Sequence, residues 1–163
     1  MLRQFLAGWL VVLLAACGIL SEKTVDNSQW SASKFYIEAK NELGEGNYSA
    51  TIKLFEALEA RYPYGRFAQQ AQLEIAYAYY KDQEQASAIA AADRFIQLYP
   101  HHHNIDYAYY IKGLASFNDD QGILGYITTN IIRQDLSERD AKASRESFES
   151  FKTLVTRYPD SKY

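Results

Sequence analysis

Few residues in this chain have the type and spacing that chemistry would need. The most conspicuous are three adjacent histidines at positions 101–103. Adjacent side chains in a turn cannot all point at one ion, and no cysteine lies near them in the sequence. Asp119-Asp120 begins a calcium-loop pattern whose remaining ligands are absent. No nucleophile–base pairing and no phosphate-cradling glycine loop is evident. The sequence therefore predicts a protein that is not an enzyme and that uses no metal and no cofactor.

The single cysteine, Cys17, has a clearer role. Residues 1–16 open with a positive charge and continue as an apolar run that is shorter than the roughly 20 residues of a membrane-spanning helix but fits a signal-peptide core. Leu14-Ala15-Ala16-Cys17 resembles the bacterial lipobox, where a peptidase cuts before the cysteine, which is then acylated. We predict a signal peptide over 1–16 and lipid, palmitate included, on Cys17. The alternative is an ordinary secretory signal with a buried cysteine.

The residues after the cysteine predict how the protein is held. The residues from Ile19 to about Ser28 are mostly polar and poor in apolar periodicity, so we expect 17–28 to form the lipid anchor and a flexible tether. Several acyl chains on one residue hold firmly. Gly18 replaces the aspartate that usually retains such lipoproteins in the inner membrane, which implies the outer membrane with the domain facing the periplasm. A net charge of −3 and the lack of a basic stripe argue against nucleic acid as a partner.

Three Tyr-Pro pairs end three similar segments, at Tyr62-Pro63, Tyr99-Pro100 and Tyr158-Pro159. Counting back 12, 11, 8 and 5 residues from each proline aligns small or apolar residues at helical spacing. These are Thr51, Ala88 and Ser147; Ile52, Ile89 and Phe148; Phe55, Ala92 and Phe151; and Leu58, Phe95 and Leu154. Ala39 and Ala76 lie 24 residues before their prolines, on an upstream helix. Each unit is therefore predicted to be a helix, a turn and a second helix that the proline ends.

This unit resembles the tetratricopeptide repeat, a 34-residue helical hairpin. We predict an all-α solenoid with three repeats over 29–163: 29–65, 66–103 and 104–163. The histidines would form a solvated turn between the last two repeats. The third has an insertion near 119–140, with helices at 104–117 and 140–157 and a cap at Ser137–Asp140. The insertion either contacts a partner or packs back on the repeat. A helical bundle in which three Tyr-Pro ends coincide by chance is the alternative.

A more specific resemblance covers nearly the whole chain. Arg61-Tyr62-Pro63-Tyr64-Gly65, Ala76-Tyr77-Ala78-Tyr79-Tyr80-Lys81 and Asn104-Ile105-Asp106-Tyr107 resemble segments of the BamD lipoprotein family, also called ComL or YfiO. The resemblance implies a component of the outer-membrane β-barrel assembly (BAM) machinery that binds the BamA-type barrel subunit, companion BAM lipoproteins and the C-terminal signals of unfolded outer-membrane proteins. It also implies that about two further repeats are missing after Tyr163.

The first helix of each repeat would line the concave face of such a solenoid. A tyrosine-rich groove with a few cations suits an extended peptide with an aromatic residue and a terminal carboxylate. The candidate binding residues are Tyr36, Lys40, Leu43, Leu73, Tyr77, Tyr80, Tyr107 and Tyr110, with Leu114 and Phe117 continuing the third stripe. Simple packing between helices is the other interpretation of these tyrosines. Two rival functions remain: a periplasmic repeat lipoprotein that serves cell-wall or competence machinery, and an enzyme on a helical scaffold.

Overall fold

The computed structural model describes residues 26–119 and 136–163. Cys17, the predicted signal peptide and most of the predicted tether and insertion lie outside these ranges. The described residues form helices and turns without a strand. The helices are α2 (Ala32–Glu45), α3 (Tyr48–Arg61), α4 (Arg66–Lys81), α5 (Gln85–Leu98), α6 (Ile105–Asp119) and α8 (Leu136–Arg157).

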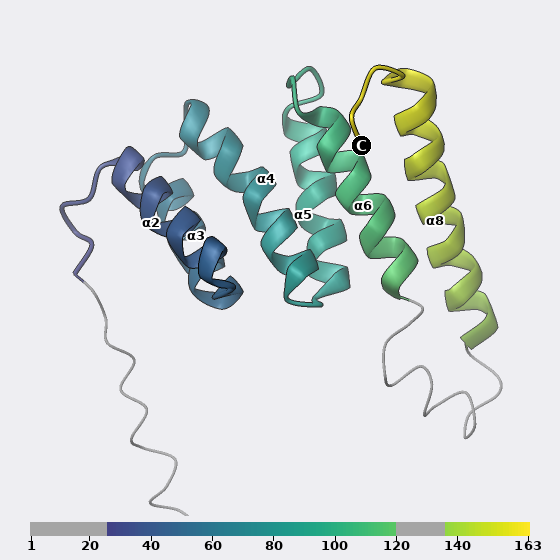
Figure 1. The fold of residues 1–163 in the computed structure, drawn as a ribbon, viewed down its shortest axis with the longest axis horizontal. Coiled ribbons are helices and arrows are strands. Elements are labelled where there is room, and N and C mark those ends of the chain that lie inside the picture. The colour runs from purple at the N-terminus through teal and green to yellow at the C-terminus, as the bar shows by residue number, and fades with distance from the viewer. Residues whose placement is uncertain (1–25, 120–135) are drawn as a thin grey trace, which may run out of the picture.

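The helices pack as three successive antiparallel hairpins, α2–α3, α4–α5 and α6–α8 (Figure 1). Each helix contacts its neighbour along the chain, and α4 also contacts α2 and α6. The first helices of the three hairpins therefore make one surface, as expected for stacked repeats. The prediction of an all-α, tetratricopeptide-type solenoid is confirmed.

The Tyr-Pro pairs end the second helices in the same way each time. The helices stop at Arg61, Leu98 and Arg157, one residue before each tyrosine. The N–H groups of Tyr62, Tyr99 and Tyr158 still donate to the carbonyls of Leu58, Phe95 and Leu154, at 2.8, 2.9 and 3.0 Å. The proline that follows has no N–H to continue the pattern, so the chain leaves the helix.

The turns inside the first two hairpins also repeat. Gly46 and Gln83 both lie 17 residues before their proline, and both have a positive φ, of 81° and 63°. In each turn the following N–H bonds a carbonyl five residues back: Asn47 to Glu42 at 2.9 Å and Glu84 to Tyr79 at 3.0 Å. This is the left-handed ending common at helix C-termini, which glycine adopts without strain.

Small residues lie where the helices of a hairpin approach each other. Ala39, Ala76 and Gly113 recur every 37 residues, and all three are buried. Each meets the position eight residues before the proline: Ala39 shares a core cluster with Phe55, Ala76 shares one with Ala92, and Gly113 faces the ring of Phe151. The core thus follows the repeat.

The third hairpin differs in two respects from what the sequence pattern indicates. Its second helix begins at Leu136, so Ser137 and Asp140 lie inside the helix and do not cap its start. Phe148, which aligns with the buried Ile52 of the first repeat, is 62% exposed. The reason is that α3 and α5 have a helix on both sides, whereas α8 contacts α6 alone among the described helices.

Candidate functional site

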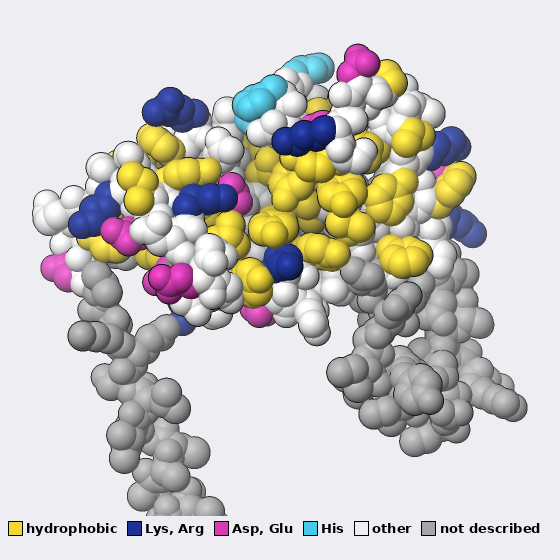
Figure 2. Space-filling model, in the orientation of Figure 1, with side chains coloured by type: hydrophobic (Ala, Val, Ile, Leu, Met, Phe, Trp, Pro, Cys, Tyr) yellow, Lys and Arg dark blue, Asp and Glu magenta, His cyan; other side chains and the backbone are white. Residues whose placement is uncertain are grey.

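The candidate site is the surface that α2, α4 and α6 share. Figure 2 shows hydrophobic side chains gathered over α4, α6 and the C-terminal segment. Both α4 and α6 present tyrosines at helical spacing there and α2 contributes Tyr36, so the repeat brings together residues that are 30 to 40 positions apart in sequence.

At the α2 end of this surface, Tyr36 is mainly a packing residue. Its ring lies 5.6 Å from those of Phe55 and Phe67, between centroids, and it is half-buried. Its hydroxyl donates to Oε1 of Glu74 at 3.4 Å. Burial, followed by the negative charge of Glu74, raises the pKa of Tyr36 to about 12. Tyr36 therefore stays a neutral donor near pH 7.

Lys40 already has an anionic partner inside the protein. Its Nζ lies 2.9 Å from Oε1 of Glu74, which also accepts from the Tyr36 hydroxyl. The Glu74 side chain is only 15% exposed, against 41% for Lys40. A peptide carboxylate that approached Lys40 would therefore compete with Glu74. Leu43, one turn further along α2, is half-buried.

Leu73 is 3% exposed and belongs to the core with Phe95 and Ala108, so it cannot line an open groove. Tyr77 and Tyr80 are partly buried and pack on the Ala76–Ala92–Ile111 cluster.

A continuous row of four tyrosines runs from α4 across α6. The ring of Tyr107 lies 6.4 Å from Tyr77 and 6.4 Å from Tyr110. Tyr163 then covers both α6 tyrosines, at 4.7 Å from Tyr107 and 5.2 Å from Tyr110. Burial, followed by the neighbouring Tyr77, raises the pKa of Tyr107 well above its usual range. We call Tyr77, Tyr107, Tyr110 and Tyr163 the tyrosine row.

The outer part of the third stripe is more open. Leu114 is half-buried and Phe117 is 56% exposed, while Phe151 of α8 lies 6.4 Å from Tyr110. The structure therefore brings Tyr77, Tyr107 and Tyr110 together, with Tyr80 nearby on α4. It places Tyr36 and Lys40 in a separate cluster around Glu74.

Sequence reasoning missed Glu74 and Tyr163. Glu74 lies three residues before Tyr77 and hence on the same helix face, so helical spacing was a usable signal. Tyr163 had none, because its position depends on how the chain turns back after Pro159. That turn is held in part by Ser161, whose hydroxyl donates to Oδ2 of Asp106 at 2.8 Å.

The histidine run forms part of the turn between the second and third hairpins. The ring of His102 packs edge-on against Phe95 at 5.1 Å, and its Nδ1 accepts from the N–H of Asn104 at 3.1 Å. Burial, with a smaller effect from His103, lowers the pKa of His102. Among the residues whose placement is described, no group of three potential ligands could hold a metal ion.

A separate cavity of about 330 Å³ lies between α3, α4 and α5. Arg94 lies in its lining, with Nη2 3.8 Å from Oε2 of Glu59, and the buried Gln72 amide, oriented with its oxygen toward Arg94, accepts from Nε at 2.9 Å. Burial is the main cause that raises the pKa of Glu59. The lining is Glu56, Glu59, Gln72, Ile75, Tyr79, Ser87, Ala90, Ala91 and Arg94.

Comparisons with known proteins agree with one another. A family model described as YfiO, outer membrane lipoprotein, matches residues 28–163. The chain is 48% identical over 155 residues to the outer membrane protein assembly factor BamD of Neisseria meningitidis serogroup B. This alignment covers 92% of this chain and 56% of the relative. BamD of Xylella fastidiosa (strain 9a5c) is 38% identical over 152 residues, 93% of this chain and 50% of the relative. BamD of Vibrio cholerae is 37% identical over 131 residues, which make up 80% of this chain and 53% of the relative. The chain spans about half the length of these curated relatives.

Proposed function

We propose that this chain, which belongs to the YfiO (BamD) family of outer membrane lipoproteins, is a component of the machinery that assembles β-barrel proteins in the outer membrane. Its relatives are named as outer membrane protein assembly factors, which is a scaffold role. The expectation that the chain is not an enzyme agrees with this.

The protein acts as a scaffold that is held at the outer membrane and faces the periplasm. Acylated Cys17 supplies the attachment. Among the described helices, none combines the length and the apolar character that crossing a bilayer takes. The partners are a BamA-type barrel subunit, companion lipoproteins and unfolded outer-membrane proteins.

The observation that best supports substrate binding is the tyrosine row. Tyr77 comes from the second repeat, and Tyr107 and Tyr110 come from the third. The ring centroid of Tyr107 lies 6.4 Å from that of Tyr77 and 6.4 Å from that of Tyr110. Tyrosine combines apolar area with a polar tip and has few rotamers to lose, which suits recognition of extended segments. The C-terminal signal of a barrel protein would place an aromatic side chain against this row.

Lys40 makes a smaller contribution in this proposal. Its charge is shared with Glu74 at 2.9 Å, and a pair of this exposure contributes only about 0.2–1 kcal/mol. Aromatic burial must then supply most of the affinity for the peptide. The remaining candidates, Tyr36, Leu43, Leu73 and Tyr80, hold the surface in shape more than they touch the ligand.

Co-purification tests the assembly role. The acylated chain, carrying an affinity tag after Tyr163, is isolated from detergent-solubilised outer membranes of its own host. Recovery of a BamA-type subunit in stoichiometric amount supports the proposal, and Cys17→Ser expressed alongside controls for attachment. If wall glycan is recovered and a barrel subunit is not, the adaptor function for cell-wall machinery replaces this proposal.

A further inference from the structure

The chain enters the fold at a fixed point. Arg61, the last residue of α3, donates from Nη1 to the carbonyls of Asn27 and Ser28, both at 2.8 Å. The Tyr62 hydroxyl donates to the carbonyl of Trp30 at 2.8 Å. These bonds hold the segment that precedes α2 against the Tyr-Pro turn after α3. The tether therefore joins the body at the edge where successive hairpins connect, which we call the tether edge.

The two edges of the solenoid differ in charge. The tether edge comprises residues 26–34, the ends of α3 and α8 and the turns between hairpins. It carries five cations against three carboxylates, a net charge of +2 with histidines neutral. These residues are Lys34, Arg61, Arg66, Arg157 and Lys162, with Asp26, Asp106 and Asp160. The opposite edge holds the turns within hairpins, and we call it the hairpin edge. In the first two hairpins, this edge carries Lys81 against four carboxylates, net −3: Glu42, Glu45, Asp82 and Glu84.

The tether edge also bears an unusually exposed aromatic residue. Tyr64, in the turn between α3 and α4, is 92% exposed. Arg66 follows two residues later, with its guanidinium 4.8 Å from the centre of the Phe67 ring. Tyrosine and arginine are the side chains that favour the headgroup layer of a bilayer, where the ring is partly buried and the cation meets phosphate. Nothing in the described fold uses the Tyr64 ring.

From the clamp, the charge difference and Tyr64 together, we infer that the tether edge rests on the anionic phospholipid headgroups of the membrane to which the protein is attached. This inference rests on the acyl anchor of the proposed function. Phosphatidylglycerol-type headgroups supply the negative charge that the edge complements, and each cation close to such a surface increases its occupancy about five-fold. The tyrosine row then runs across the body below the membrane, open to the periplasm.

Chain length favours the same orientation. From Cys17 to Asp26 the chain can span at most about 30 Å when fully extended. A hairpin helix of 14–16 residues is about 21–24 Å long. Turning the hairpin edge to the membrane would use most of the reach of the tether to pass along the body, and it would bring four carboxylates to the headgroups.

Orientation can be measured on the acylated full chain in bilayer nanodiscs. One set contains phosphatidylethanolamine with phosphatidylglycerol, and the other contains phosphatidylcholine. A headgroup-nitroxide lipid broadens nearby amide NMR signals. We expect strong broadening at residues 64–66 and 101–103 and little at 82–84, with the contrast largest in the anionic discs.

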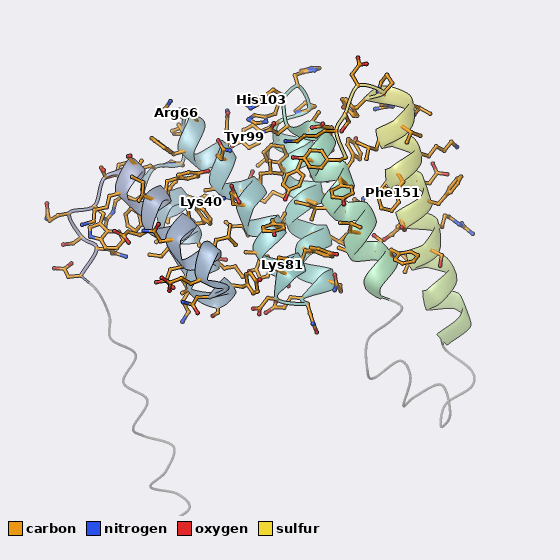
Figure 3. The ribbon with its side chains drawn as sticks, in the orientation of Figure 1. Lys40, Arg66, Lys81, Tyr99, His103 and Phe151 are labelled. Carbon is orange, nitrogen blue, oxygen red and sulfur yellow. The ribbon has the colours of Figure 1, made fainter. Side chains whose placement is uncertain are left out.

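The matched variants lie at opposite ends of one helix. Figure 3 shows Arg66 and Lys81 at the two ends of α4, both exposed cations. Arg66→Glu combined with Tyr64→Ala should reduce the occupancy of this orientation on the order of ten-fold, whereas Lys81→Glu should leave it unchanged. Unaltered thermal unfolding of both variants shows that each one folds.

Equal broadening of the two edges in the parent chain, or an equal effect of the two variants, would overturn the inference. A protein that co-purifies with a barrel subunit yet shows equal broadening keeps the proposed assembly role and loses only this orientation. A chain that is not acylated would fail to enter the discs, which identifies failure of the anchor itself.

Discussion

The ring of Phe151 on α8 lies directly against the backbone of Gly113 on α6. A Cβ placed at position 113 would be 2.8 Å from Cε1 and Cζ of that ring, closer than real Cβ contacts allow. The Ser147 hydroxyl also donates to the Gly113 carbonyl at 2.9 Å, so the two helices are joined at this point. In the other hairpins alanine occupies this position.

Gly113→Ala is therefore expected to destabilise the protein by about 1–3 kcal/mol through overpacking, although alanine is the better helix former. Chemical denaturation followed by circular dichroism measures the change. Gly44→Ala is the control, since no atom lies within 4 Å of its would-be Cβ, and it should be neutral or stabilising. Adding Phe151→Leu should recover part of the loss. Equal stability of the Gly113 and Gly44 variants would contradict the close packing.

Phe55→Ala tests the repeat core. Phe55 is fully buried, and its removal is expected to cost about 3–5 kcal/mol in the free energy of unfolding. Phe148→Ala, at a position that is 62% exposed, should cost less than about 0.5 kcal/mol. A loss below about 1 kcal/mol for Phe55→Ala would mean that its side chain is not part of the core.

Gln83→Gly should stabilise the protein. Gln83 has φ 63° at the position where the first hairpin uses Gly46, and a left-handed conformation costs a non-glycine residue about 1–2 kcal/mol. After the greater entropy of glycine in the unfolded chain is subtracted, a gain of about 0.5–1 kcal/mol is expected. The same exchange inside α4, Gln70→Gly, should cost about that amount instead. Thermal melts of the two variants should shift in opposite directions.

Tyr77→Ala should weaken binding of a barrel protein's C-terminal peptide more than Lys40→Ala does. The Tyr77 ring is part of the tyrosine row, whereas Lys40 is already paired with Glu74. Calorimetric titration with that peptide gives both affinities. Tyr64→Ala serves as the control, because the exposed Tyr64 ring makes no contact with the tyrosine row. Parent-like binding by both variants would mean that substrates are recognised elsewhere.

Cys17→Ser should release the protein from the membrane. Without the thiol no acyl chain can be attached, so the variant is expected in the soluble periplasmic fraction or as an unprocessed precursor. Fractionation with mass spectrometry of the N-terminus distinguishes the two forms. Processed, membrane-bound protein with serine at position 17 would refute the lipobox.

The repeat was predictable because its signals are local. Each Tyr-Pro pair ends a helix by its own backbone chemistry, and the offsets of Ala39 or Phe55 follow from helical geometry alone. The composition of the candidate surface was only partly predictable, because Leu73 and Tyr77 both fit the first-helix stripe but only one of them lies outside the core. The pairing of Lys40 with Glu74 depends on how α2 stacks on α4, and the exposure of Phe148 depends on α8 contacting α6 alone among the described helices. Neither relationship is contained in a single helix.

The third hairpin joins its helices through residues 120–135, where the first two use two or three residues, yet α6 and α8 pack in the same repeat register. Lengthening a connection from three to sixteen residues costs only about 1.5 kcal/mol in closure entropy, since each doubling adds about 0.6 kcal/mol. The α6–α8 interface, with the Gly113–Phe151 contact at its centre, is therefore what pairs these helices. A chain divided within 120–135 should therefore reassemble from two co-expressed fragments. Association of the two fragments would then report whether the α6–α8 interface has formed.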